Sequence, residues 1–256
     1  MLLNLKEPSE ALLHAQRAVA LAKELYQADP NNQRSRRAYQ HALSSAGIVR
    51  RALARSDPSQ LPMATQSLEH AHSLASSSAR LDSKNVSAKD DLIVQCHRFA
   101  GALVQSGKPD LAAALYEEAG KIIREVIAIN PANRRYWYLS AANQVHYGGL
   151  RLGQGLLPKA RDLLLSADAP FERALSLDAF DATLLEVRAS QFEKLASVAV
   201  KLGDREEARR RIRQCLEIVS AMIGRDPSAK DYIGDYKQMI MSARELGVST
   251  RNLPEP

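Results

Sequence analysis

The sequence predicts an all-α fold, a right-handed α-solenoid of about ten helices stacked as antiparallel hairpins, and three observations lead to it. Glycines recur at intervals of 48 residues, at Gly107, Gly155 and Gly203. Aromatic residues make up only 5% of the chain whereas alanine and leucine abound, which favours closely packed helices over sheets. Small residues recur five and twelve residues after each glycine: Ala112, Ala160 and Ala208, then Ala119, Ala167 and Cys215.

Each copy of the repeat closes on an acidic or amide residue that precedes a turn. These junction residues are Asp29, Asp82, Asn130, Asp178 and Asp226. The last four follow one another at 48 residues, and the first precedes the second by 53, so five extra residues are inserted there. We expect residues 1–247 to form a single array with junctions near 29, 82, 130, 178 and 226, and residues 248–256 to form a flexible tail.

The first three helices are predicted from their periodic apolar residues and from the turns that end them. The first is expected from about Ser9, a favourable N-cap, to Ala28. The turn at 29–32 ends it, because Pro30 cannot continue the helical hydrogen bonds. The next two are expected at about 33–55 and 62–81, with the five inserted residues between them.

From residue 83 onward the repeat predicts pairs of helices joined by short turns. Pro170 lies inside one of these helices and should kink it or split it at Asp168. A final helix is expected at about 228–246, ending at Gly247, a favourable C-cap. The paired helices are expected at about 86–105 with 109–129, 133–152 with 157–177, and 182–202 with 205–224.

Small residues on both sides of each turn predict a close approach of the two helices. Ala100, Gly148 and Ala196 lie seven residues before the turn glycines. Facing the alanines five residues after those glycines, they would let the helix axes approach to about 8 Å, the near end of the usual range. A leucine at Ala112 or Ala208 should therefore overpack the hairpin, at a cost of roughly 1–3 kcal/mol.

Together, the small residue, the turn glycine, the two alanines and the closing Asp-Pro-x-Asn resemble the tetratricopeptide repeat (TPR). The TPR unit has about 34 residues, and the longer unit fits if both helices of each hairpin are extended. The tryptophan and tyrosine of the TPR signature are replaced by Cys96, Gln144 and Phe192. The resemblance covers about residues 9–247. Such long repeats are also similar to helical regions that follow the catalytic domain in some bacterial serine/threonine kinases.

The net charge and the cysteine content indicate which kinds of partner and which cellular compartment the protein favours. The net charge is +6, with clusters of arginine such as the one at 209–213. Glu206 and Glu207 stand at helix-pairing distance from that cluster, so we interpret it as a solvated helix face, and nucleic-acid binding is the less favoured alternative. Cys96 and Cys215 are predicted to be buried thiols in a reducing, cytoplasmic compartment. No run reaches 18 apolar residues, so no membrane insertion is expected.

The search for catalytic, cofactor and metal sites predicts none. The glycine-rich stretch 148–155 lacks the Lys-Ser/Thr pair and the preceding strand of a phosphate-binding loop. His70 and His72 are two residues apart and point to different helix faces, whereas metal-binding pairs on a helix stand three or four apart. Cys96 and His97 also diverge, and we find no pairing of a nucleophile with a base. The chain is therefore predicted not to be an enzyme.

The TPR resemblance implies a protein-interaction scaffold, in which the first helix of each hairpin lines a concave groove for a peptide or partner protein. Two rows of side chains recur there and would suit a peptide backbone and acidic groups. The rows are Gln95, Asn143 and Gln191, and then Arg98, His146 and Lys194. A second possible lining is His97, Val145 and Glu193 with Gly101, Gly149 and Ser197. The resemblance does not extend to the Lys and Asn of the chaperone-tail carboxylate clamp.

The first helix is the second member of a hairpin whose first member is missing. Its outer face is therefore expected to be bare unless Leu2, Leu3 and Leu5 cover it. This predicts that another subunit docks there or that the chain is part of a longer protein, and the alternative function is a regulatory or substrate-docking region of a larger bacterial enzyme such as a kinase.

Overall fold

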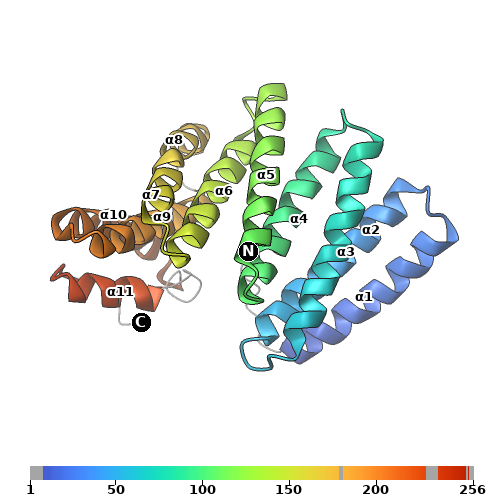
Figure 1. Ribbon diagram of the computed structural model, residues 1–256, viewed down its shortest axis with the longest axis horizontal. Coiled ribbons are helices and arrows are strands. Elements are labelled where there is room, and N and C mark those ends of the chain that lie inside the picture. The colour runs from blue at the N-terminus through green and yellow to red at the C-terminus, as the bar shows by residue number, and fades with distance from the viewer. Residues whose placement is uncertain (1–7, 179–180, 229–235, 252, 254–256) are drawn as a thin grey trace. The chain divides into compact units, whose positions relative to one another are not determined.

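The computed structural model describes residues 8–178, 181–228, 236–251 and 253 (Figure 1). All regular elements in these ranges are helices. The described residues fall into two compact units, an N-terminal unit up to Ile129 and a C-terminal unit from Asn130 onward. The all-α helical repeat fold predicted from the sequence is confirmed, and the single continuous array of residues 1–247 stays a prediction.

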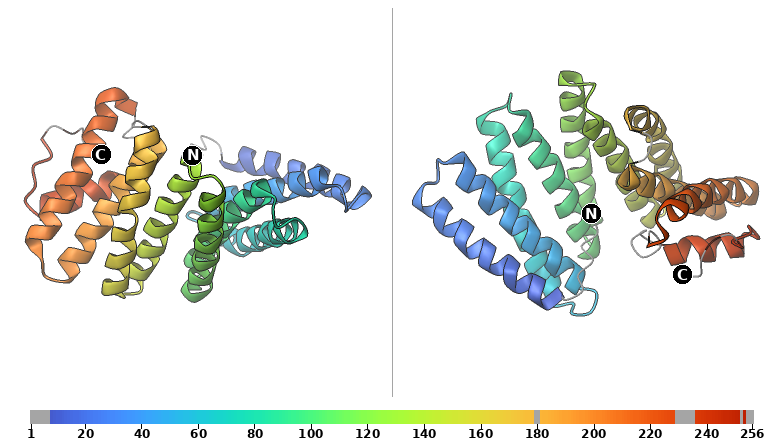
Figure 2. Two further views of the ribbon diagram at one scale, coloured as in Figure 1. Left: turned by 90° about the horizontal axis from the view of Figure 1, so that it is seen from above. Right: turned by 180° about the vertical axis from the view of Figure 1, so that it is seen from behind.

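The N-terminal unit consists of five long helices, each antiparallel to the next (Figure 2). They are α1 (Pro8–Ala28), α2 (Gln33–Leu53), α3 (Gln60–Leu81), α4 (Val86–Gln105) and α5 (Pro109–Ile129). Helix α1 exposes Leu21 and Leu25, 64% and 62% accessible, on the face expected to be bare. Leu2, Leu3 and Leu5 lie outside the described residues, and docking of another protein on this face stays a prediction.

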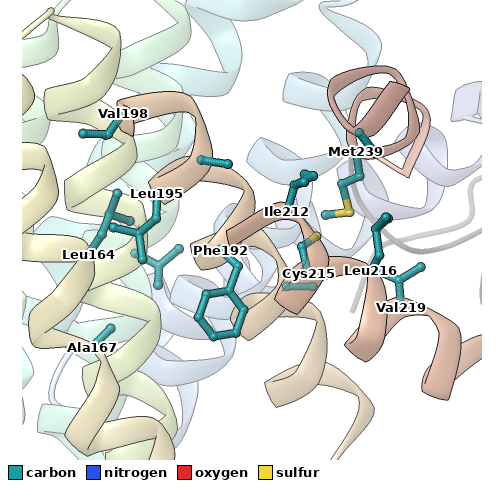
Figure 3. Close-up of a cluster of buried hydrophobic side chains, with 14 of the residues drawn as sticks. Leu164, Ala167, Phe192, Leu195, Val198, Ile212, Cys215, Leu216, Val219 and Met239 are labelled. Atoms are coloured by element: carbon teal, nitrogen blue, oxygen red, sulfur yellow. The ribbon is translucent and has the colours of Figure 1, made fainter. Parts of the chain in front are cut away.

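The C-terminal unit continues the pattern of hairpins around one apolar core. Its helices are α6 (Arg134–Gly153), α7 (Leu157–Ser166), α8 (Asp168–Leu177), α9 (Ala182–Lys201), α10 (Arg205–Arg225) and α11 (Tyr236–Glu245). Figure 3 shows the centre of this core, where Phe192, Ile212 and Met239 gather from α9, α10 and α11. The helix predicted at 157–177 is split, as Pro170 requires, because proline has no N–H for the helical hydrogen bond.

The junction motif works as a helix N-cap. Its fourth residue accepts hydrogen bonds from backbone N–H groups of the next helix: Asn32 Oδ1 from Arg34 at 2.9 Å and Asn85 Oδ1 from Ala88 at 3.0 Å. In the C-terminal unit Asp181 does the same for Leu184 at 2.9 Å. The first-turn N–H groups of a helix have no partner within the helix, so this residue fixes where the helix after each junction begins.

The turn glycines close the helices as the repeat predicts. Gly107, Gly155, Gly203 and Gly247 have φ of 69°, 73°, 81° and 71°, in the left-handed region that glycine adopts without steric cost. The residue after each glycine donates a backbone hydrogen bond to a carbonyl five residues earlier, for example Lys108 to Leu103 at 2.9 Å. This is the Schellman ending of a helix, and it explains the regular spacing of the glycines.

The ends of the chain differ in part from expectation. Of the final helix predicted at 228–246, residues 229–235 lie outside the described residues, and α11 covers Tyr236–Glu245. In the expected tail, Val248 and Leu253 pack against the core of the C-terminal unit. No helix in the described part of the chain has the length and apolar character needed to cross a membrane.

Replacing Ala112 by leucine is expected to lower the free energy of unfolding by roughly 1–3 kcal/mol, because the side chain is fully buried where α5 faces α4. Urea unfolding followed by circular dichroism measures the change. The matched control is Ala114→Leu, since Ala114 is exposed on the same helix and leucine is a good helix former. Equal stability of the two variants would show that α4 and α5 do not pack closely at Ala112.

Candidate functional site

The candidate surface lies on the first helices of the hairpins, here called the inner helices: α2 and α4 in the N-terminal unit, α6 and α9 in the C-terminal unit. Within each unit the two inner helices are in contact. Each inner helix also packs on its hairpin partner, and α4 and α9 pack in addition on the outer helix of the preceding hairpin. Only a narrow strip of α4 and α9 therefore reaches solvent.

The amide row of the predicted groove is not on that strip. Gln95 and Gln191 are fully buried and Asn143 is 3% exposed. Gln191 shows the reason, because its Nε2 donates to the Leu164 carbonyl on α7, the outer helix of the preceding hairpin. All three amides are buried, so they are not accessible to a ligand in this structure, and their role in a groove stays a prediction.

The basic row is accessible in part, and its members lie in different units. Arg98 on α4 is half-buried and donates from Nη1 to Ser44 Oγ on α2 at 2.7 Å. His146 on α6 is exposed. Lys194 on α9 donates from Nζ to Ser190 Oγ at 2.6 Å and lies 3.8 Å from the Glu193 carboxylate.

Two glycines on the inner helices leave room for long cationic side chains from the neighbouring inner helix. A Cβ added at Gly101 would collide with the guanidinium of Arg51 from α2. A Cβ added at Gly149 would stand 3.0 Å from Cε of Lys194. The second lining predicted from the sequence included both glycines, but it did not identify Arg51. Burial lowers the pKa of Arg51, the direction expected for a cation removed from water.

Three other members of the second predicted lining are buried or already have a partner within the protein. Val145 is buried at 1% exposure. Glu193 is held between Lys194 and Ser197, whose hydroxyl donates to it at 3.2 Å. His97 lies against the ring of Tyr116, with 6.0 Å between ring centroids. The inner strip is therefore a mixture of small residues and cationic side chains, without an exposed amide row.

An ion pair joins the inner helices of the N-terminal unit near their N-terminal ends. The guanidinium of Arg37 on α2 contacts the carboxylate of Asp91 on α4 at 2.7 Å and 3.1 Å. Beside it, Gln40, Arg36 and Ser87 line part of a cavity of about 140 Å³. The cavity is too small for a peptide, and Asp91 supplies negative charge within it.

Three arginines of the cluster at 209–213 form ion pairs within their own helix. Arg209 Nη1 lies 2.6 Å from Glu206, Arg211 Nε lies 2.8 Å from Glu207, and Arg210 also contacts Glu207. These are the helix pairs predicted from the sequence. Much of the positive charge that could have attracted a phosphate backbone is thus neutralised locally.

Sequence reasoning missed a cluster formed by His72, Cys96 and Glu118. They lie on α3, α4 and α5, and their ligand atoms are all within 4.8 Å of one another. His72 Nε2 stands 3.3 Å from Glu118 Oε2. The hydrogen bond with His72 is the largest influence on Glu118 and lowers its pKa, while burial raises the pKa of the Cys96 thiol. No spacing of residues within one helix could have predicted this cluster, because each of its residues comes from a different helix.

A partly buried network of hydrogen bonds lies at the break between α7 and α8. Gln191 Nε2 donates to Asp168 Oδ1 at 2.9 Å, and Arg188 Nη1 donates to Asp168 Oδ1 and to Gln191 Oε1 at 2.6 Å and 2.8 Å. The Arg188 guanidinium lies over the rings of Phe171 and Phe192, 4.8 Å and 4.6 Å from their centroids. The network bonds backbone and side-chain groups at the break that Pro170 causes.

Comparison with known proteins gives structural likenesses only. No family model matches the sequence, and no curated protein matches it. The fold is similar to BtubC from P. vanneervenii, with a TM-score of 0.46 and 16% identity over 86% of this chain and 93% of that one. It is also similar to YrrB, described as a TPR protein with an unusual peptide-binding site (TM-score 0.45, 14% identity, 92% and 86% of the chains). A third similar structure is TTC0263, a thermophilic TPR protein of Thermus thermophilus, with a TM-score of 0.40 and 14% identity over 89% of this chain and 99% of that one.

Proposed function

We propose that this protein is a non-enzymatic interaction scaffold that binds an acidic, extended segment of a partner protein on the inner helices. The observation that carries the proposal is the pattern of half-buried cations between the inner helices of each unit. Arg51 and Arg98 lie on neighbouring inner helices of the N-terminal unit, and Lys194 lies across Gly149 in the C-terminal unit. Because each unit is compact, each inner surface is treated as a binding surface in its own right.

The chemistry of these side chains suits carboxylates. Arg98 donates to Ser44 on α2, and Arg51 Nη1 lies 3.5 Å from the Arg98 carbonyl, so both guanidinium groups lie at the contact between α2 and α4. A guanidinium binds a carboxylate through two parallel hydrogen bonds, and it keeps its charge across the physiological pH range. The glycines beside them lack a side chain, so the long cationic side chains of Arg51 and Lys194 can lie against the neighbouring inner helix. We also propose the reducing, cytoplasmic location predicted from the sequence, in which the thiols of Cys96 and Cys215 would stay reduced.

A random peptide library displayed on phage and selected against the whole chain tests the proposal. We expect enrichment of peptides rich in Asp and Glu, and measurable binding of synthetic copies by calorimetry. Arg98→Glu or Lys194→Glu should weaken binding of the peptide that contacts that unit by tenfold or more, because each replaces attraction by repulsion.

The matched controls are Lys121→Glu on α5 and Arg161→Glu on α7, exposed charges on the outer helices of the two units. Both should bind like the unaltered protein, which separates the inner surface from a general effect of net charge. Selected peptides that lack acidic residues, or whose affinity does not change in either inner-helix variant, would show that the inner helices are not the binding surface.

A further inference from the structure

Three different metal-binding groups converge in the N-terminal unit, each from a different helix. His72 on α3 offers an imidazole nitrogen, Cys96 on α4 a sulfur and Glu118 on α5 a carboxylate oxygen. We propose that these three residues form a binding site for a divalent transition-metal ion, with Zn²⁺ as the ion that best fits the donors. The site is independent of the peptide-binding surface proposed above.

The spacing of the donor atoms suits a four-coordinate ion. Zn²⁺ binds nitrogen, oxygen and sulfur at roughly 2.0–2.3 Å, so ligand atoms in a tetrahedral site stand roughly 3.3–3.8 Å apart. His72 Nε2 and Glu118 Oε2 are already at 3.3 Å, and the largest separation in the cluster is below 4.8 Å. Small rotations of side chains would therefore bring all three onto one ion without a movement of the helices.

The burial and the charges of the three ligand residues also suit a bound divalent ion. Cys96 is fully buried, while the side chains of His72 and Glu118 are 18% and 38% exposed, so the cluster opens to solvent on one side. A water molecule can enter there as the fourth ligand. A thiolate and a carboxylate together cancel the two charges of the ion, which makes the occupied site neutral and lowers the cost of burial. Arg80 also acts on the Glu118 carboxylate and competes with the ion for it.

The repeat itself does not require these residues. One repeat length further along the chain, Cys96 corresponds to Gln144, Glu118 to Ser166 and His72 to Gly120. Two lengths from Cys96 stands Phe192, an apolar core residue. The packing of a hairpin therefore accepts other side chains at all three positions, and only this copy gathers three metal-binding groups among the described residues. A bound ion would tie the outer helix α3 to both helices of the next hairpin.

Titration of the untagged, reduced, metal-free chain with Co²⁺ and with Zn²⁺ tests the proposal. We expect one equivalent of Co²⁺ to produce a thiolate-to-cobalt charge-transfer absorption, and Zn²⁺ to displace it. Zn²⁺ should also raise the unfolding temperature, because an ion that binds only the folded protein stabilises it, and a chelator should reverse the shift.

The chain offers a matched control in its second thiol, Cys215, which is buried like Cys96 but belongs to no such cluster in the described residues. Cys96→Ser should lose the charge-transfer absorption, and Cys215→Ser should keep it. His72→Asn and Glu118→Gln, which leave the thiol in place, should keep the fold and weaken Zn²⁺ binding by tenfold or more. Absence of the absorption in the unaltered chain, or its persistence in Cys96→Ser, would overturn the site.

Discussion

Replacing Gln95 by methionine is expected to raise the free energy of unfolding by about 1–3 kcal/mol. Gln95 is fully buried in α4, and neither its Nε2 nor its Oε1 has a hydrogen-bond partner among the described residues. A buried amide without partners has lost its bonds to water and gained nothing in return. Methionine has a similar length, fills the same space and carries no group that needs a partner. Urea unfolding followed by circular dichroism measures the gain.

The same substitution at Gln191, the corresponding position two repeats later, is expected to have the opposite sign. Gln191 bonds to Leu164, Asp168 and Arg188, so methionine would remove three hydrogen bonds, two of them to charged groups. The expected loss is roughly 2–4 kcal/mol. This variant is the control for the first, since burial and the side-chain change are the same and only the hydrogen bonds differ. If both variants shifted stability in the same direction, hydrogen bonding at these amides would not explain their energetics.

Local signals in the sequence were sufficient to predict the hairpins. The turn glycines, the fourth residue of each junction and Pro170 act through the backbone of their own turn or helix, so their effects could be predicted before any packing was known. The repeat also predicted that Gly148 faces the helix that begins at Leu157, because both flank one short turn. The structure confirms these predictions in the described residues.

Contacts between hairpins could not be predicted in the same way. The period of 48 residues aligned Gln95 with Gln191, but it did not say whether they face solvent or the preceding outer helix. The cluster of His72, Cys96 and Glu118 likewise depends on how α3 packs against the next hairpin. Such contacts are set by the rotation of each helix about its axis. The next residue along a helix is turned by about 100°, slightly over a quarter of a turn, which can move it from the solvent strip to the interior.

Replacing Gly148 by alanine is expected to lower the free energy of unfolding by about 1–3 kcal/mol, although alanine favours helices. A Cβ on Gly148 would lie 2.7 Å from Leu164 Cγ and 3.3 Å from the Ala160 carbonyl oxygen, both on the facing helix α7. The main collision is with Leu164 Cγ, a branch point close to the backbone, so either the leucine side chain or helix α7 must shift. The matched control is Gly153→Ala at the end of the same helix, where no atom lies within 4 Å of the added Cβ. This variant is expected to be stabilised by roughly 0.5–1 kcal/mol, the usual difference between glycine and alanine in a helix.

Three kinds of residue pair occupy this hairpin contact: glycine with leucine, alanine with tyrosine (Ala100 and Tyr116), and alanine with isoleucine. The last pair suggests how the lost stability can be restored. Gly47 faces Leu68 and Gly148 faces Leu164 with almost the same close approach. At the corresponding positions of another hairpin stand Ala196 and Ile212, both buried. An isoleucine branches at Cβ instead of Cγ, so it moves bulk away from the point that the leucine Cγ occupies. Adding Leu164→Ile to Gly148→Ala should therefore recover at least half of the lost stability, while Leu164→Ile alone should cost less than about 1.5 kcal/mol. A double-mutant cycle from four urea titrations gives the coupling energy, and a value near zero would mean that Gly148 is required for a reason other than its contact with Leu164.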